Sequence, residues 1–167
     1  YKRLENISEK KAIIRNHNLE NTPYPFESKL FKIINFTNVL EHLINRSDSL
    51  KEVSRLLSDK GICLISIPNR NTLWKRIQRF CEIDSRDCKD HKIEYSIYEI
   101  QNEIKTAGLK IKGKMQPIVP SFPLNGLIAC CAIFSPKLYI FFQKLKRYLV
   151  KNNIVDTIGW VFEVEKN

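Results

Sequence analysis

The pattern of apolar and polar positions predicts strands and helices in alternation along the chain. Residues 31–37 are rich in β-branched and aromatic side chains and have the length of a strand. Residues 61–68 are an almost continuous apolar run, which is typical of a strand buried on both faces in a helix-covered parallel sheet. Further strands are expected in residues 109–119 and 154–165, with a weak one at 12–15. Strands that alternate with helices define the α/β class.

Helices are expected where apolar residues recur at spacings of three and four. Residues 39–44 predict a short helical turn, and residues 47–58 predict a helix that Gly61 separates from the next strand. Ser49 and Glu52 have capping-box spacing inside that helix, which leaves its start open. Residues 72–81 predict a basic helix whose apolar face should point inward, made of Leu73, Trp74, Ile77 and Phe80.

Two later helices have clear start signals. Ser96 and Glu99 form a capping box, and Gly108 ends the helix that follows. Ser135 and Pro136 provide an N-cap and a first-turn proline for a helix that runs to about residue 150.

Composition narrows the class of protein. The 167 residues are 43% hydrophobic and 28% charged, which gives enough apolar material for about one domain and excludes disordered and coiled-coil classes. The net charge of +10 favours an anionic partner. Five cysteines without a C-x-x-C motif indicate free thiols, so we expect a reducing, cytoplasmic location.

The order of motifs resembles that of the class I S-adenosylmethionine-dependent methyltransferases, especially their small-molecule type 11/12 domains. The first matching segments are Asn18-Leu19-Glu20, Tyr24-Pro25-Phe26, Phe31-Lys32-Ile33-Ile34, Val39-Leu40-Glu41-His42 and Ile65-Ser66-Ile67-Pro68-Asn69. Later matches are His91-x-x-x-Tyr95-Ser96, Ala107-Gly108-Leu109 and Trp160-Val161-Phe162. The resemblance covers about residues 12–165. It implies a Rossmann-like sheet with helices on both faces, and methyl transfer from S-adenosylmethionine.

Some parts of the family pattern have no counterpart in these residues. The first of only five glycines is Gly61, so no glycine-rich loop opens the chain. Compared with the family pattern, the first two strands and the acid that holds the cofactor ribose also have no counterpart. We therefore expect residues 1–167 to form a single incomplete, N-terminally truncated domain with an incomplete S-adenosylmethionine site. The resemblance leaves Asn18 and the Leu19 amide for the adenine, with Phe36 and Thr37 beside the methionine part.

The resemblance makes Glu41, His42 and His91 the catalytic candidates on the acceptor side. Histidine suits acid–base work because it titrates near neutral pH. A turn that ties neighbouring backbone together is the alternative for Glu41 and His42, and a surface loop is the alternative for His91.

A metal site is not predicted. Some quinone-pathway members of the family carry E-x-x-E-H as a metal-linked site, but Asn38 stands at the first acidic position here. A zinc site at Cys81, Cys88 and His91 is disfavoured because it has three ligands and an uncommon spacing.

A basic, apolar insertion is expected at about residues 115–151, where no Asp or Glu occurs. Its second half predicts a helix with one apolar face, made of Leu138, Phe141, Phe142, Leu145 and Leu149. That face is either an interfacial surface that meets anionic lipid or a cover packed over the active site. A second basic cluster, at residues 70–79, lacks a nucleic-acid-binding motif, so nucleic acid is a disfavoured partner.

The function expected from these features is methyl transfer to a small-molecule or lipid-linked acceptor, with this chain as the C-terminal part of the domain. The alternative is a non-catalytic relic or subunit of the same fold that binds a partner or an anionic membrane. The missing loop favours the alternative for the chain alone, and the intact Glu41-His42 and Pro68-Asn69 segments favour the enzyme for the parent protein.

Overall fold

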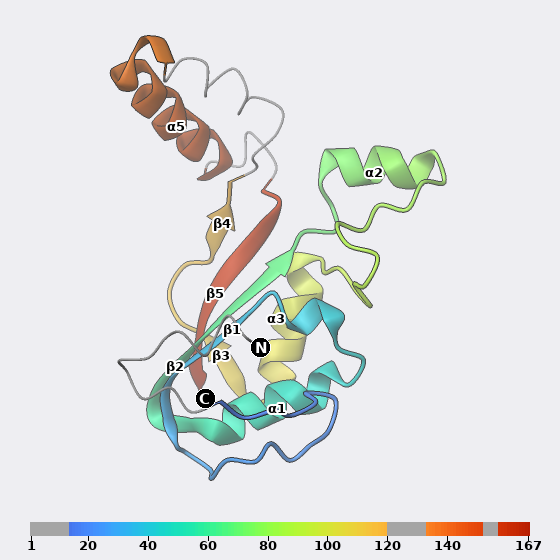
Figure 1. The fold of residues 1–167 in the computed structure, drawn as a ribbon, viewed down its shortest axis with the longest axis vertical. Helices are drawn as coiled ribbons and strands as arrows, with labels where there is room; N and C mark the ends of the chain where they lie inside the picture. The colour runs from blue at the N-terminus through green and yellow to red at the C-terminus, as the bar shows by residue number, and fades with distance from the viewer. Residues whose placement is uncertain (1–13, 120–132, 152–156) are drawn as a thin grey trace.

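The computed structural model describes residues 14–119, 133–151 and 157–167, and these form a mixed α/β fold (Figure 1). Its strands are β1 (Phe31–Thr37), β2 (Leu57–Pro68), β3 (Leu109–Ile111), β4 (Gln116–Ile118) and β5 (Gly159–Lys166). They form one sheet in the order β1-β2-β5-β3, and β4 also pairs with β5. β1 and β2 are parallel, whereas β5 runs antiparallel to β2, β3 and β4.

The strand regions predicted at residues 31–37, 61–68, 109–119 and 154–165 all contribute to this one sheet, with β2 between β1 and β5. The predicted strand at 109–119 is two short strands, separated where Gly113 adopts a φ of 71°. The last strand begins at Gly159, and residues 154–156 lie outside the described residues. Of the weak strand at 12–15, Ile14 and Arg15 have no regular structure, and the other two residues lie outside the described part.

The core lies between the sheet and two neighbouring helices, α1 (Arg46–Leu56) and α3 (Ile97–Thr106). Alternate residues of β2 and β5 face these helices, as a strand's two-residue period requires. The buried residues from the four elements are Leu50, Val53, Cys63, Ile65, Ile67, Ile100, Ile104, Phe162 and Val164. The opposite face of β2 carries the half-buried Ile62 and Leu64. The described residues thus show helical cover on one face of the sheet.

The predicted break at Gly61 is wrong. α1 ends at Leu56, and β2 begins at the next residue and continues through Gly61. The pairing of β1 with β2 jumps from Phe31–Leu57 to Ile33–Ile62, so extra β2 residues bulge at this point. A Cβ on Gly61 would lie 2.8 Å from the Phe31 carbonyl oxygen. Glycine is needed here for close backbone approach, not for ending a helix.

Ser49 and Glu52 do not cap α1, because the N-cap residue is Asn45. Both lie inside the helix and hold the preceding loop instead. The Ser49 hydroxyl donates to the Leu19 carbonyl at 3.3 Å, and the Glu52 carboxylate accepts from the Tyr24 amide at 2.7 Å. The loop predicted around residues 18–26 is therefore fixed against α1.

Helix α2 (Leu73–Phe80) begins after the N-cap Thr72, but its predicted orientation is wrong. The four apolar side chains expected to face inward are exposed by 45–90%. The buried residue of α2 is Lys75, which pairs with carboxylates of the following loop. That ion pairing, which no local pattern signals, decides which side of the helix is buried.

Helix α5 (Pro136–Lys151) starts as expected, with the Ser135 hydroxyl accepting from the Leu138 amide. In Figure 1, α2 and α5 both stand beyond the same end of the sheet, apart from α1 and α3. Among the residues that the structure describes, no helix is long and apolar enough to cross a membrane.

Candidate functional site

Two of the predicted catalytic residues follow directly from the end of β1. After Thr37 the chain turns at Asn38, whose φ is 54°, and forms the one-turn helix η1 (Leu40–His42). Leu40 is fully buried in the core and anchors this turn. Glu41 and His42 are consequently held at the carboxyl end of a parallel strand, where open α/β sheets bind their ligands.

The third predicted residue, His91, is brought to the same place by backbone hydrogen bonds. The amides of Lys92 and Ile93 both donate to the carbonyl of Glu41, at 2.8 and 3.3 Å. The loop that carries His91 is thereby fixed to η1. The rings of His42 and His91 meet edge to face, with centroids 4.7 Å apart.

Glu41, His42 and His91 form one compact cluster. One ligand atom from each lies within 4.8 Å of the others. Glu41 and His91 are buried and His42 is half-buried. The Glu41 Oε2 atom is buried without a protein hydrogen-bond partner. A buried carboxylate oxygen in that state costs free energy unless a donor or a cation meets it.

Glu94 fixes the orientation of His91. Its carboxylate lies 3.2 Å from His91 Nδ1 and also accepts from Lys75 at 2.8 Å and from the Asp87 amide at 2.7 Å. Burial by itself would raise the pKa of Glu94, but these hydrogen bonds hold the pKa below its ordinary value. An ionised carboxylate only accepts, so His91 Nδ1 carries the proton and its Nε2 is left as a base or ligand.

The donor set suits two kinds of chemistry. Two imidazoles and a carboxylate can exchange protons with a substrate heteroatom. The same set is one that divalent transition metals accept, with open positions left for a substrate. The prediction of no metal is untested, and the cluster gives a specific place to test it. Within the described residues His91 groups with Glu41 and His42, not with Cys81 and Cys88.

Two of the four predicted cofactor residues line a groove, and the other two do not. Leu19 and Phe36 line one groove of about 340 Å³ beside β1, together with Tyr24, Phe26, Phe31, Ile33, Ile34, Asn35, Val39, Val53 and Leu56. Asn18 and Thr37 are not among its lining residues. The side-chain oxygen of Asn18 accepts from the Glu20 amide at 3.0 Å. The lining of this groove is mostly apolar, as is usual for small-molecule sites.

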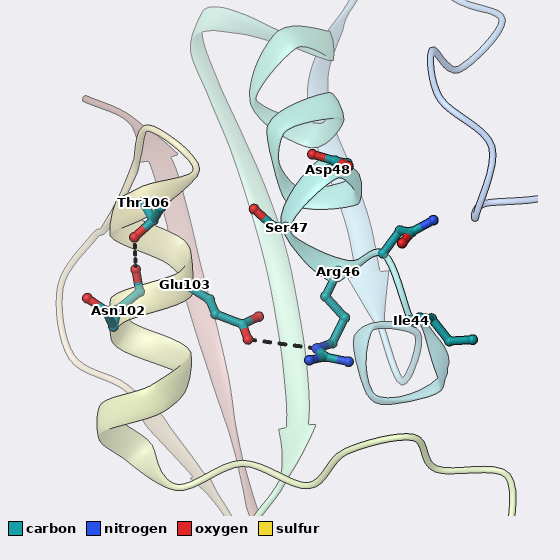
Figure 2. Close-up of a pocket in the computed structure, with 8 residues that line it drawn as sticks. Ile44, Arg46, Ser47, Asp48, Asn102, Glu103 and Thr106 are labelled. Atoms are coloured by element: carbon teal, nitrogen blue, oxygen red, sulfur yellow. Dashed lines mark hydrogen bonds and ion pairs between the residues drawn. The ribbon is translucent and has the colours of Figure 1, made fainter.

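A second groove, of about 350 Å³, lies between the start of α1 and α3 (Figure 2). Arg46 and Glu103 point toward each other across it, with Arg46 Nε 3.7 Å from the Glu103 carboxylate. Thr106 bonds back to the Asn102 carbonyl of its own helix. None of the predicted site residues lines this groove.

Sequence reasoning missed Lys75 and Glu94, which support the cluster from outside it. Glu94 belongs to no recognised motif. Lys75 is one of several basic residues in its helix, so nothing in the sequence distinguishes it from the others. A weak signal exists in the spacing of His91 and Glu94, which are three residues apart and therefore able to meet in a turn.

Comparison with known proteins agrees with this fold. A family model described as a methyltransferase domain matches residues 2–65. No curated protein matches the chain. Among solved structures, the complex of the Haloferax volcanii Trm112 methyltransferase activator with a methyltransferase matches at a TM-score of 0.50 and 12% identity, covering 90% of this chain and 58% of that one.

Two further structures are similar. A structure described as a pericyclic reaction enzyme matches at a TM-score of 0.50 and 12% identity, over 90% of this chain and 29% of its own. An S-adenosylmethionine-dependent methyltransferase from Thermotoga maritima matches at a TM-score of 0.49 and 17% identity, over 62% of this chain and 49% of its own. The chain thus spans about half the length of that relative. This chain has the class I methyltransferase fold over part of the domain. Such a fold does not by itself fix the reaction.

Proposed function

We propose that this chain forms the acceptor side of a methyl-transfer site that acts on a small-molecule or lipid-linked acceptor. The observation that carries the proposal is the convergence of Glu41, His42 and His91 at the carboxyl end of β1. Val39 lines the apolar groove, and Glu41 follows two residues later. A cofactor-sized groove and a proton-accepting cluster therefore adjoin along the chain.

The roles of the residues follow from their surroundings. S-adenosylmethionine, when bound, supplies a methyl group that is already activated on a sulfonium sulfur. Asn18 and Leu19 would contact its adenine, and Phe36 and Thr37 would lie beside its methionine part. Nε2 of His91, left free by the Glu94 contact, would take the proton that the acceptor loses, and His42 and Glu41 would hold the acceptor in line.

A divalent cation bound by the same cluster is a second candidate. The buried Glu41 Oε2 without a partner favours it. In that case the cation would bind and orient an oxygen atom of the acceptor, and His91 would be a ligand of the cation instead of a base. The non-catalytic alternative is a relic of the fold that binds a partner or a membrane. In that case Glu41, His42 and His91 would only hold the turn after β1 in place.

The test is transfer of labelled methyl from S-adenosylmethionine into small-molecule and lipid extracts by the native protein that contains this chain. Glu41→Gln, His42→Asn and His91→Asn should each lower transfer at least tenfold, while exposed Glu27→Gln should leave it unchanged. Inhibition by a chelator, reversed by Zn²⁺ or Mn²⁺, would favour the cation over direct acid–base work. Full activity in all three cluster variants would refute the proposal, and no transfer by the wild type would favour the relic.

A further inference from the structure

Helix α2 presents an apolar face to solvent. Leu73, Trp74, Ile77 and Phe80 are exposed by 61%, 67%, 45% and 90%. They occur at positions i, i+1, i+4 and i+7, so they share one side of the helix. Ile83, just beyond the helix, is also 57% exposed. Large apolar residues gathered on one side in this way mark an interaction surface.

The orientation of this face is fixed from the other side of the helix. Lys75 is buried by its ion pairs with Glu94 and Asp87, at 2.8 and 2.7 Å. Turning the apolar face inward would withdraw the Lys75 ammonium from both carboxylates and leave the buried Glu94 without that cation. The face is therefore held outward by the same contacts that support His91.

A second helix has the same character. On α5, Leu138, Phe141 and Tyr148 are 42%, 57% and 61% exposed, and Phe134, just before it, is 86% exposed. Figure 1 shows α5 and α2 beyond the same end of the sheet, which is the end toward which β2 runs. Two exposed amphipathic helices are thus available at one end of the molecule.

Basic residues outnumber acidic ones around both faces, which favours an anionic partner. Residues 104–155 contain no Asp or Glu, and α5 carries exposed Lys137, Lys144 and Arg147. α2 itself has no acidic residue and adds exposed Arg76 and Arg79. Exposed Glu82 and Asp84 follow it, and Asp84 is paired with Arg86. Aromatic side chains flanked by Lys and Arg are what a helix at the surface of an anionic bilayer presents.

We propose that the exposed faces of α2 and α5 dock this protein peripherally on anionic membranes. The apolar and aromatic side chains enter the interfacial region of the lipid, while the basic residues contact its phosphate groups. Docking would bring the end of the sheet that carries Glu41 and His42 near the bilayer. The proposal does not depend on methyl transfer, since it concerns binding alone.

The test is sedimentation of the native protein with vesicles of phosphatidylcholine alone and of phosphatidylcholine mixed with phosphatidylglycerol. Binding should require the anionic lipid and should fall as salt screens the basic residues. Trp74→Ser with Phe80→Ser should lower the binding constant at least a hundredfold, because burying each aromatic side chain in lipid favours binding by a factor of about ten or more. Phe141→Ser alone should lower it roughly tenfold.

The matched control is Ile44→Ser, which removes an apolar side chain that is 68% exposed outside α2 and α5. It should bind like the wild type. All variants should melt at the wild-type temperature, since the replaced side chains are exposed. Unchanged binding of the Trp74/Phe80 variant, or equal binding to neutral vesicles, would overturn the proposal. So would a wild-type dimer that this variant converts to a monomer without any lipid binding, because the face would then join two copies of the chain.

Discussion

The Lys75 ammonium lies 2.8 Å from the Glu94 carboxylate, with only 5% and 3% of the two side chains exposed. Glu94 also contacts His91, which lies beside His42. One buried ion pair therefore links the outward orientation of α2 to the orientation of a candidate catalytic histidine. Changes at this pair should affect both stability and the cluster.

Glu94→Gln should lower the free energy of unfolding by about 3 kcal/mol near neutral pH, because it removes the buried partner of Lys75 and leaves Asp87, which is 53% exposed, beside that charge. Urea unfolding measures this loss. Asp59→Asn, which breaks the exposed ion pair with Lys29, is the control and should leave stability nearly unchanged. An equal, small effect of both changes would contradict a structural role for the buried pair.

The same variant should change the dependence of stability on pH. The pKa of Glu94 is lowered in the folded state from its ordinary value of 4.5. Its carboxylate therefore stabilises the fold above pH 4.5, and this contribution is lost as pH falls through the folded-state pKa. The stability difference between wild type and Glu94→Gln should shrink as the solution is acidified below that range. A difference that stays constant down to the acid-unfolding pH would show that Glu94 is not the group responsible.

Gly61→Ala should destabilise the protein by about 1–3 kcal/mol, because the new Cβ would press against the Phe31 carbonyl 2.8 Å away. Thermal or urea unfolding checks the value. The neighbouring Lys60→Ala removes an exposed side chain from the same strand and should have little effect. Stability equal to that of the wild type in Gly61→Ala would mean that β1 and β2 do not approach so closely.

Cys63 should resist alkylation in the folded protein. Burial raises the pKa of its thiol to about 12, so almost no thiolate forms near neutral pH. Cys81, at the exposed end of α2, should react readily. Peptide mapping after brief alkylation should find Cys81 modified and Cys63 modified only after unfolding. Modification of both at equal rates would contradict the burial of β2.

Features with a local chemical signal were predictable from the sequence. The capping box of Ser96 and Glu99 is present as expected, because its two bonds join residues three positions apart. β1 has the predicted bounds, because its strand length and β-branched content are local properties. The class I methyltransferase fold followed from the order of motifs.

Features set by distant partners were not predictable. The outward face of α2 depends on Lys75 meeting Glu94, 19 residues later. Gly61 resembled a helix breaker because its partner, the Phe31 backbone, is far away in the sequence. Glu41 and His42 were predicted as candidates, and so was His91, but their contact depends on backbone amides of the His91 loop reaching the Glu41 carbonyl. No periodic pattern reports such a bond.

The state of the His91 ring tests the account of the site most directly. Because Nδ1 faces the ionised Glu94, neutral His91 should carry its proton on Nδ1 and leave Nε2 free beside His42 and Glu41. Long-range nitrogen–proton NMR spectra of the native protein distinguish the two tautomers. Wild-type His91 should show the Nδ1–H tautomer, and Glu94→Ala should remove that preference. Neutral His91 with its proton on Nε2 would contradict the proposed base and its support by Glu94.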